Sequence, residues 1–188
     1  LVGLGEAADQ TTPSGAADWY GQALEIGERT GNAQVRSTAG TGLARLHLLT
    51  GDIDASLAIA ATATTVGHPP DQAMLALLTG LAHRRNHQAA TAVDHLRRAL
   101  THTGTRLTAN PDDYAAADIR ALAFCGLSLT EPDAAPAHLH EAVCAFRQAR
   151  RITAAPGIVA RTLHLFDHLT DHPTPALQQA RTAASTTM

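Results

Sequence analysis

The sequence contains no lysine, few aromatic residues and only two cysteines. All 14 basic residues are arginine, and aromatic residues make up 3% of the 188 positions. Without lysine the chain has no Gly-x-x-x-x-Gly-Lys loop, which excludes a P-loop nucleotide site within it. So little aromatic volume favours alanine- and leucine-rich helices that pack closely, rather than a compact enzyme. Cys125 and Cys144 lack metal-ligand spacing, and we expect two buried thiols without a disulfide.

Long apolar runs and blocks of one charge are also missing. No apolar stretch approaches the roughly 18 residues of a membrane span. The formal net charge is −3, and charges of both signs are interspersed. We therefore expect a cytoplasmic protein that makes no direct contact with nucleic acid or membrane. The arginine-, alanine- and histidine-rich composition is typical of a GC-rich genome, such as that of an actinobacterium.

Histidine is the abundant residue type that could carry chemistry, with 11 copies. His164, His168 and His172 are spaced four residues apart, as are His83 and His87, and this spacing can place metal ligands on one helix face. Neither run has the adjacent glutamate of a zinc-hydrolase helix. We therefore expect solvent-facing or helix-terminal histidines. The sequence predicts no enzyme, and no catalytic, cofactor or metal site.

A helical repeat pattern runs through the whole chain. Five times a small residue is followed four positions later by a second apolar residue and three positions after that by alanine. Positions i, i+4 and i+7 share one helix face, and alanine lets a neighbouring helix approach closely. The final alanines lie 34 to 50 residues apart, which is typical of an α-solenoid. The triplets are Ala16-Tyr20-Ala23, Ser56-Ala60-Ala63, Ala92-Leu96-Ala99, Ala142-Phe146-Ala149 and Ala176-Ala180-Ala183.

Proline and glycine positions predict the helix boundaries. Asn110 should cap a helix that starts at Pro111, with Asp112 and Asp113 at the positive end of its dipole. Before Ala149 the repeat is unusually long, so either the preceding helix extends past residue 101, or the loop 130–135 is enlarged, or both. The expected helices are 15–30, 34–50, 52–66, 71–85, 88–105, 111–130, 136–152, 156–170 and 174–185.

One segment resembles a known repeat family. Leu43-Ala44-x-x-His47, the turn Gly51-Asp52 and the Ser56 triplet are similar to a tetratricopeptide repeat of the bacterial type. The resemblance implies an all-α, right-handed α-solenoid of antiparallel helix hairpins with about four and a half repeats in one domain, 1–188. The units are 1–30, 34–66, 71–105, 111–152 and 156–185. Because the first unit starts within its first helix, we expect a piece of a longer protein with an exposed apolar end.

The resemblance also implies a binding surface. In this family the first helices of the hairpins line a concave groove, and about one arginine per hairpin of this chain lies at or near such a position. Arginine pairs with carboxylate or phosphate through a planar fork, which favours an acidic or C-terminal segment. Alternatively, these arginines pair with acids of the chain or stay solvated. The groove candidates are Arg45, Met74, Leu77, Leu81, Arg84, Arg120, Phe124 and Arg161.

These patterns favour a regulatory module of a larger bacterial protein. We expect a non-catalytic scaffold that binds a protein or peptide segment in its concave groove. One alternative is a receptor for a small ligand or signalling peptide, which a deeper and more apolar concave face would favour. Another is self-association through the exposed repeat ends, giving a homo-oligomer.

Overall fold

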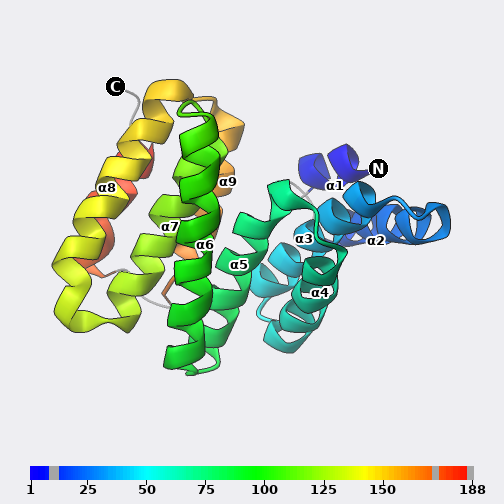
Figure 1. Cartoon of the computed structure of the whole chain (residues 1–188), viewed down its shortest axis with the longest axis horizontal. Coiled ribbons are helices and arrows are strands. Elements are labelled where there is room, and N and C mark those ends of the chain that lie inside the picture. The colour runs from blue at the N-terminus through cyan, green and yellow to red at the C-terminus, as the bar shows by residue number, and fades with distance from the viewer. Residues whose placement is uncertain (9–12, 171–173, 186–188) are drawn as a thin grey trace.

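The computed structural model describes residues 1–8, 13–170 and 174–185. Within them the chain is all-α, with ten α-helices, one short 3-10 turn and no strand. Figure 1 shows the helices following one another along the long axis of the molecule, from α1 and α2 at one end to α8 at the other. The helices are α1 (Val2–Ala8), α2 (Pro13–Thr30), α3 (Ala33–Thr50), α4 (Ile53–Val66), α5 (Pro69–Arg85), α6 (Ala89–Ala109), α7 (Tyr114–Thr130), α8 (Ala135–Ile152), α9 (Pro156–Asp167) and α10 (Pro175–Ser185).

Short side chains and glycines fix several helix ends. The Asn32 side chain accepts a hydrogen bond from the Val35 amide at 3.1 Å, and Asp52 accepts one from Ala55 at 3.2 Å. Both bonds satisfy amides that lack a partner within the first turn of a helix. Gly51 ends α3 in the left-handed conformation, with φ of 86°. A side chain there would be strained, which explains the Gly-Asp turn.

The region between α6 and α8 differs from the prediction at one boundary. The prediction that Asn110 caps a helix starting at Pro111 is wrong, because α7 starts at Tyr114 and is capped by Asp113. Asn110 instead donates its amide to the Arg106 carbonyl and ends α6. The long interval between Ala99 and Ala149 has both of its expected causes, since α6 extends to Ala109 and a 3-10 turn, Pro132–Ala134, precedes α8.

The alanine triplets lie in the core almost as the repeat pattern predicts. Every member of the first four triplets is at most 3% exposed. In the fifth triplet Ala180 and Ala183 are buried, but Ala176 is exposed, so its prediction as a seam residue is wrong. Leu177, one position later, is buried in its place. Burying alanine on these faces brings helix backbones close together.

Glycine makes room for the bulky middle residue of a triplet. A Cβ at Gly42 of α3 would lie 2.4 Å from the Tyr20 ring of α2. Leu96 of α6 fits in the same way between Gly80 of α5, where a Cβ would lie 2.8 Å away, and Gly126 of α7. These distances are shorter than van der Waals contact, so any larger residue would separate the helices.

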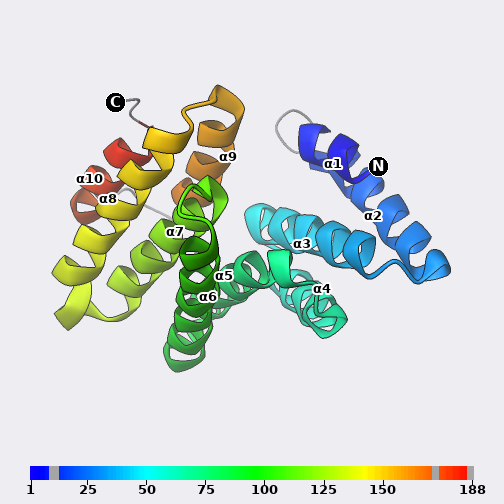
Figure 2. The same ribbon diagram turned by 45° about the horizontal axis from the view of Figure 1, so that its top comes forward.

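Consecutive helices from α1 to α8 pack against one another. The order then changes, because α9 contacts α7 and α10, and α10 packs mainly against α8. Figure 2 shows α1 to α4 on one side of α5 and α6, and α7 to α10 on the other. Across the described ranges, no helix is both long and apolar enough to cross a membrane.

Candidate binding pocket

A pocket of about 310 Å³ lies where four alternate helices meet. We call it the α3–α9 pocket, since α3, α5, α7 and α9 form most of its walls. The α3 residues are Thr38, Thr41, Gly42 and Arg45, and the α9 residues are Ile158, Arg161, Thr162 and Leu165. Each set follows the spacing i, i+3, i+4, i+7, so one continuous face of each helix borders the cavity. Its volume falls within the range typical of ligand sites, about 300–1,000 Å³.

The α3 wall carries a buried arginine. Arg45 is 7% exposed, and its Nη2 donates to the Tyr20 hydroxyl at 3.3 Å. Tyr20 reaches this position because Gly42 leaves room for its ring. The charge of Arg45 also affects a side chain of α9. Burial first, and then the charges of His168 and Arg45, lower the pKa of His164 on α9.

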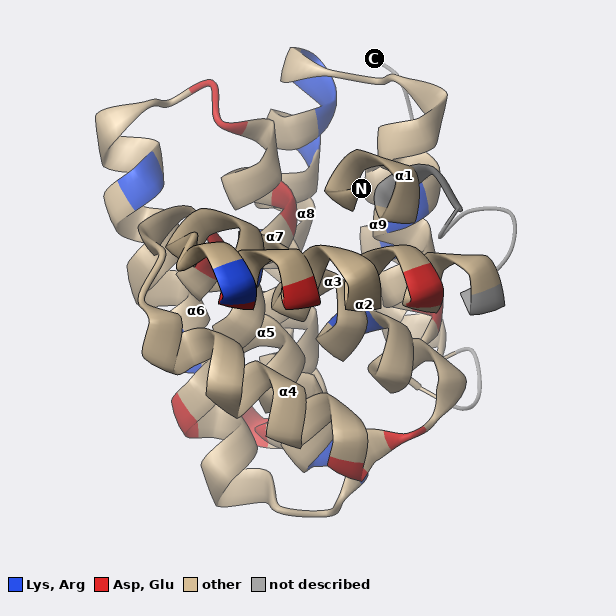
Figure 3. Cartoon of the chain, turned by 90° about the vertical axis from the view of Figure 1, so that its right-hand side faces the viewer, with Lys and Arg blue, Asp and Glu red and all other residues tan. Residues whose placement is uncertain are grey.

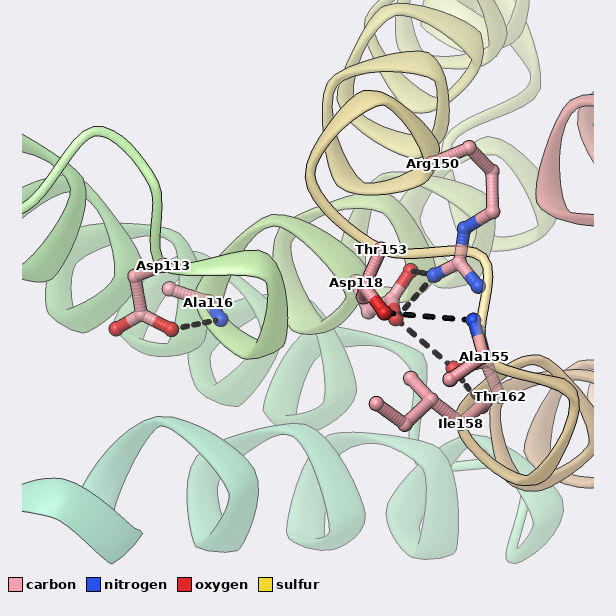
Figure 4. Close-up of polar contacts among 8 residues, drawn as sticks. All are labelled: Asp113, Ala116, Asp118, Arg150, Thr153, Ala155, Ile158 and Thr162. Atoms are coloured by element: carbon pink, nitrogen blue, oxygen red, sulfur yellow. Dashed lines mark hydrogen bonds and ion pairs between the residues drawn. The ribbon is translucent and has the colours of Figure 1, made fainter. Parts of the chain in front are cut away.

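The α7 wall contains a buried ion pair that joins three helices (Figure 4). Arg150 of α8 donates from Nη2 to both carboxylate oxygens of Asp118 on α7. The Thr162 hydroxyl of α9 donates to Asp118 Oδ2 at 3.0 Å. Burial raises the pKa of the Asp118 carboxyl, while the bonds from Arg150 and Thr162 oppose that rise. Removing two charges from water is costly, so this pair depends on all its partners.

Two further charged side chains that line the pocket have identified partners. Arg106 forms a two-pronged contact with Asp113, through Nε to Oδ2 at 2.9 Å and Nη2 to Oδ1 at 3.1 Å. Asp71 accepts a hydrogen bond from the Thr38 hydroxyl at 3.0 Å, and His68 Nδ1 lies 3.0 Å from the same oxygen. The apolar side chains of the lining include Met74, Ile119, Leu122 and Leu165.

Three of the eight predicted groove residues come together in this pocket, namely Arg45, Met74 and Arg161. Leu77 and Leu81 are buried in the core instead. Arg84 lies in the last turn of α5, about 15 Å along the helix from Met74 at the usual rise per residue.

Arg120 and Phe124 lie on the other side of α7. Arg120 follows Asp118 by two residues, which is about 200° around the helix. Its guanidinium lies 5.2 Å from the centre of the Phe124 ring. Arg120 also lines a separate recess with side chains of α6 and α8. Arg120 therefore serves as a natural contrast to Arg161, since both are half-buried arginines but only Arg161 borders the α3–α9 pocket.

Sequence reasoning missed Tyr20, Asp118 and Thr162 as pocket residues. Tyr20 was assigned to packing, and its hydroxyl gives no signal in the sequence. Asp118 did carry a signal, because it stands between Ala117 and Ile119 in an otherwise apolar part of α7. An acid in that setting is rarely buried without a partner, which predicts a basic residue facing it.

Three of the described histidines of the two runs, His83, His164 and His168, contact other groups of the protein. The rings of His164 and His168 are 5.0 Å apart, and His168 Nδ1 lies 2.9 Å from the His164 carbonyl. His83 stacks on His95 at 5.4 Å. His172 lies outside the described residues. In the part of the chain that the structure describes, no group of three or more potential ligands is placed to hold a metal ion.

The two cysteines differ from the expected buried pair. Both are free thiols. Cys125 is buried, and burial raises the pKa of its thiol, which makes it a weak nucleophile. Cys144 is exposed, so the expectation that both thiols are buried is wrong. Cys144 lies on the side of α8 that borders the recess beside Arg120.

Charged side chains are scattered over the surface, whereas the exposed large apolar side chains among the described residues lie at one end of the molecule. Figure 3 shows acidic and basic residues distributed among the helices rather than collected in one area. Exposed large apolar side chains lie on α1 and α2 and just before α1, at Leu1, Leu4 and Ile26. Self-association through this end stays a prediction.

No protein-family model matches the chain, and comparisons with curated proteins and with solved structures give no significant match.

Proposed function

We propose that the chain is a non-catalytic binding domain that holds a protein or peptide segment against the α3–α9 pocket. In this proposal the helices form a right-handed solenoid of the tetratricopeptide type, and α3, α5, α7 and α9 are its concave-side helices. The observation that carries the proposal is that these four alternate helices meet at one pocket. The first helices of stacked hairpins have this arrangement in repeat proteins.

The composition of the pocket supports binding rather than catalysis. Asp118, Asp71 and Arg106 make hydrogen bonds with other side chains of the chain. Apolar and polar side chains both line the pocket, and in recognition sites apolar contact gives affinity while polar groups fix orientation. An extended segment lying across these helices would bury one of its side chains in the pocket.

A peptide selection tests this function. The purified chain is used to select binders from a display library of random peptides, beside Arg161→Gln and Arg120→Gln. Both variants remove one half-buried arginine, and circular dichroism must show that all three proteins are equally folded. We expect a shared sequence pattern with the parent chain and Arg120→Gln, and its loss with Arg161→Gln. Enrichment that is identical for all three proteins would contradict the proposal, as would no enrichment at all.

A receptor for a small ligand is the second candidate. Two features of the α3–α9 pocket favour this candidate. Four helices supply most of its walls, and its volume is about 310 Å³. A small molecule could fill this space without any flanking contact. A library that yields no peptide, together with a metabolite that raises the melting temperature of the parent chain but not of Arg161→Gln, would favour this candidate.

A further inference from the structure

The buried side chains of α9 are unevenly placed along the helix. Leu165 and Phe166, in its last turn, are almost fully buried. In its first half, residues 156–161, none of the described side chains is buried. That half nevertheless supplies Ile158 and Arg161 to the α3–α9 pocket. Core packing therefore fixes the end of α9 more firmly than its start, which forms part of the pocket wall.

The first buried side chain of α9 is polar. The Thr162 hydroxyl lies 3.0 Å from Asp118 Oδ2 on α7 and 3.1 Å from the carbonyl of Ile158 in its own helix. A hydroxyl has one proton to donate, and a carboxylate is the stronger acceptor. Figure 4 shows the Thr162 side chain directed at this carboxylate. A hydrogen bond at the pocket wall therefore joins the middle of α9 to α7.

Arg150 fixes the Asp118 carboxylate from behind the wall. Its Nη2 contacts both carboxylate oxygens, its side chain is entirely buried, and it does not line the pocket. The ion pair therefore anchors the acceptor of the Thr162 bond without occupying the space that a bound segment would take. Thr162 directly follows Arg161 in the helix, so a shift of Thr162 away from α7 would carry Arg161 and Ile158 with it.

We infer that Thr162 is a positioning residue for binding at the α3–α9 pocket. Its hydrogen bond to Asp118 sets the place of the first half of α9, and with it the separation between the α9 wall and the α3 wall. The inference rests on the proposed function and names a residue that acts on affinity through the place of a helix. Thr162 itself lines the pocket, so the test has to separate positioning from a direct contact with the bound segment.

Two substitutions of Thr162 test the hydroxyl. Thr162→Val removes it and keeps the shape of the side chain, whereas Thr162→Ser keeps it. The matched control is Thr103→Val on α6, because Thr103 is also buried, donates to the Leu100 carbonyl of its own helix and does not line the pocket. By titration calorimetry, we expect the strongest selected peptide to bind Thr162→Val about tenfold more weakly, which is the factor for losing one hydrogen bond to a charged group. Thr162→Ser and Thr103→Val should bind it as the parent chain does.

A measurement without peptide detects the place of α9 itself. Burial first, and then the charges of His168 and of Arg45 on α3, lower the pKa of His164, two residues after Thr162. If α9 moves away from α3, the burial and the effect of Arg45 both decrease, and the pKa of His164 rises toward its ordinary value. An NMR titration of the ring protons, assigned with His164→Gln, should show this rise in Thr162→Val but not in Thr162→Ser or Thr103→Val.

Several outcomes would overturn the inference. They are an unchanged affinity of Thr162→Val, an equal loss in Thr103→Val or Thr162→Ser, and a loss in Thr162→Val with an unchanged pKa of His164. The last result would assign the hydroxyl to direct contact with the segment. Arg161→Gln separates this failure from that of the proposed function. A peptide that requires Arg161 but not the Thr162 hydroxyl leaves the function standing, whereas one that requires neither removes both.

Discussion

The α3 wall and the α7 wall of the pocket use a buried arginine in different ways. On the α3 wall, Arg45 contacts the hydroxyl of Tyr20, whose ring is accommodated by Gly42. Behind the α7 wall, Arg150 binds the carboxylate of Asp118 and does not line the pocket. The first arrangement places an arginine at the cavity. In the second, the positive charge of Arg150 is neutralised by Asp118 inside the protein. The ion pair of the α7 wall joins helices, whereas the α3 wall is the one for which we propose a role in binding.

The ion pair of the α7 wall should give the largest stability effect. Asp118→Ala leaves the buried Arg150 charge without its carboxylate, which costs about 3–5 kcal/mol. Urea unfolding should show this loss. Replacing both partners, as in Asp118→Leu with Arg150→Met, should recover most of it, since no buried charge remains.

Asp112→Ala is the matched control for Asp118→Ala, because Asp112 is exposed and lies just before α7. It should change the free energy of unfolding by no more than about 0.5 kcal/mol. Equal stability of Asp118→Ala and Asp112→Ala would show that the ion pair does not hold the α7 wall together.

Gly42→Ala tests the α3 wall and should give the next largest effect. The added Cβ would overlap the buried Tyr20 ring, so we expect the free energy of unfolding to fall by about 1–3 kcal/mol. Gly104→Ala is the control, because a Cβ there meets nothing within 4 Å. It should stabilise α6 by up to about 1 kcal/mol, since alanine favours helix more than glycine. Opposite signs in thermal or urea unfolding confirm the close approach, and equal signs contradict it.

Overpacking the alanine seams should have a comparable or smaller effect. Ala92→Leu and Ala142→Leu enlarge residues that are 0% exposed, which should cost about 1–3 kcal/mol. Ala176→Leu, at the exposed position of the fifth triplet, should be neutral within about 0.5 kcal/mol. Unfolding midpoints measured side by side check both expectations. A neutral Ala92→Leu or Ala142→Leu would remove those alanines from the seam.

The smallest expected effect is a pH dependence. Burial, with nearby positive charges, lowers the pKa values of His95 and His164 in the folded chain. As the pH falls below about 6.5, the unfolded chain therefore takes up protons before the folded chain does, and stability decreases. The melting temperature should fall in that window, and less so in the double variant His95→Gln with His164→Gln. An equally steep fall in the variant would assign the dependence to other groups.

The helices were predictable from the sequence because their signals are local. Alanine triplets, Gly51 and the prolines at 69, 156 and 175 act within one or two turns, and the predicted helices agree with the structure to within a few residues. The start of α7 was missed because Asn110, Asp112 and Asp113 can all cap a helix, and the one that does is Asp113, which binds the Ala116 amide. The local pattern offers no way to choose between them.

The pocket was only partly predictable. The resemblance to tetratricopeptide repeats implied Arg45, Met74 and Arg161 as groove residues, but the contacts that shape the pocket join residues far apart in the chain. Tyr20 and Arg45 are 25 residues apart, and Asp118 and Thr162 are 44 apart. Such pairs depend on how helices cross, which one sequence does not specify. For the same reason Arg120 and Arg161 look equivalent in the sequence but lie on different surfaces.

The most direct measurement is the affinity of the strongest selected peptide for the parent chain, Arg161→Gln and Arg120→Gln, by titration calorimetry. Losing a charge-assisted hydrogen bond costs about 1.5–3 kcal/mol, which corresponds to an affinity about 10- to 150-fold weaker. We predict that loss for Arg161→Gln and an unchanged Kd for Arg120→Gln. Equal affinity for all three proteins would show that the peptide binds elsewhere and that the α3–α9 pocket is not the binding site.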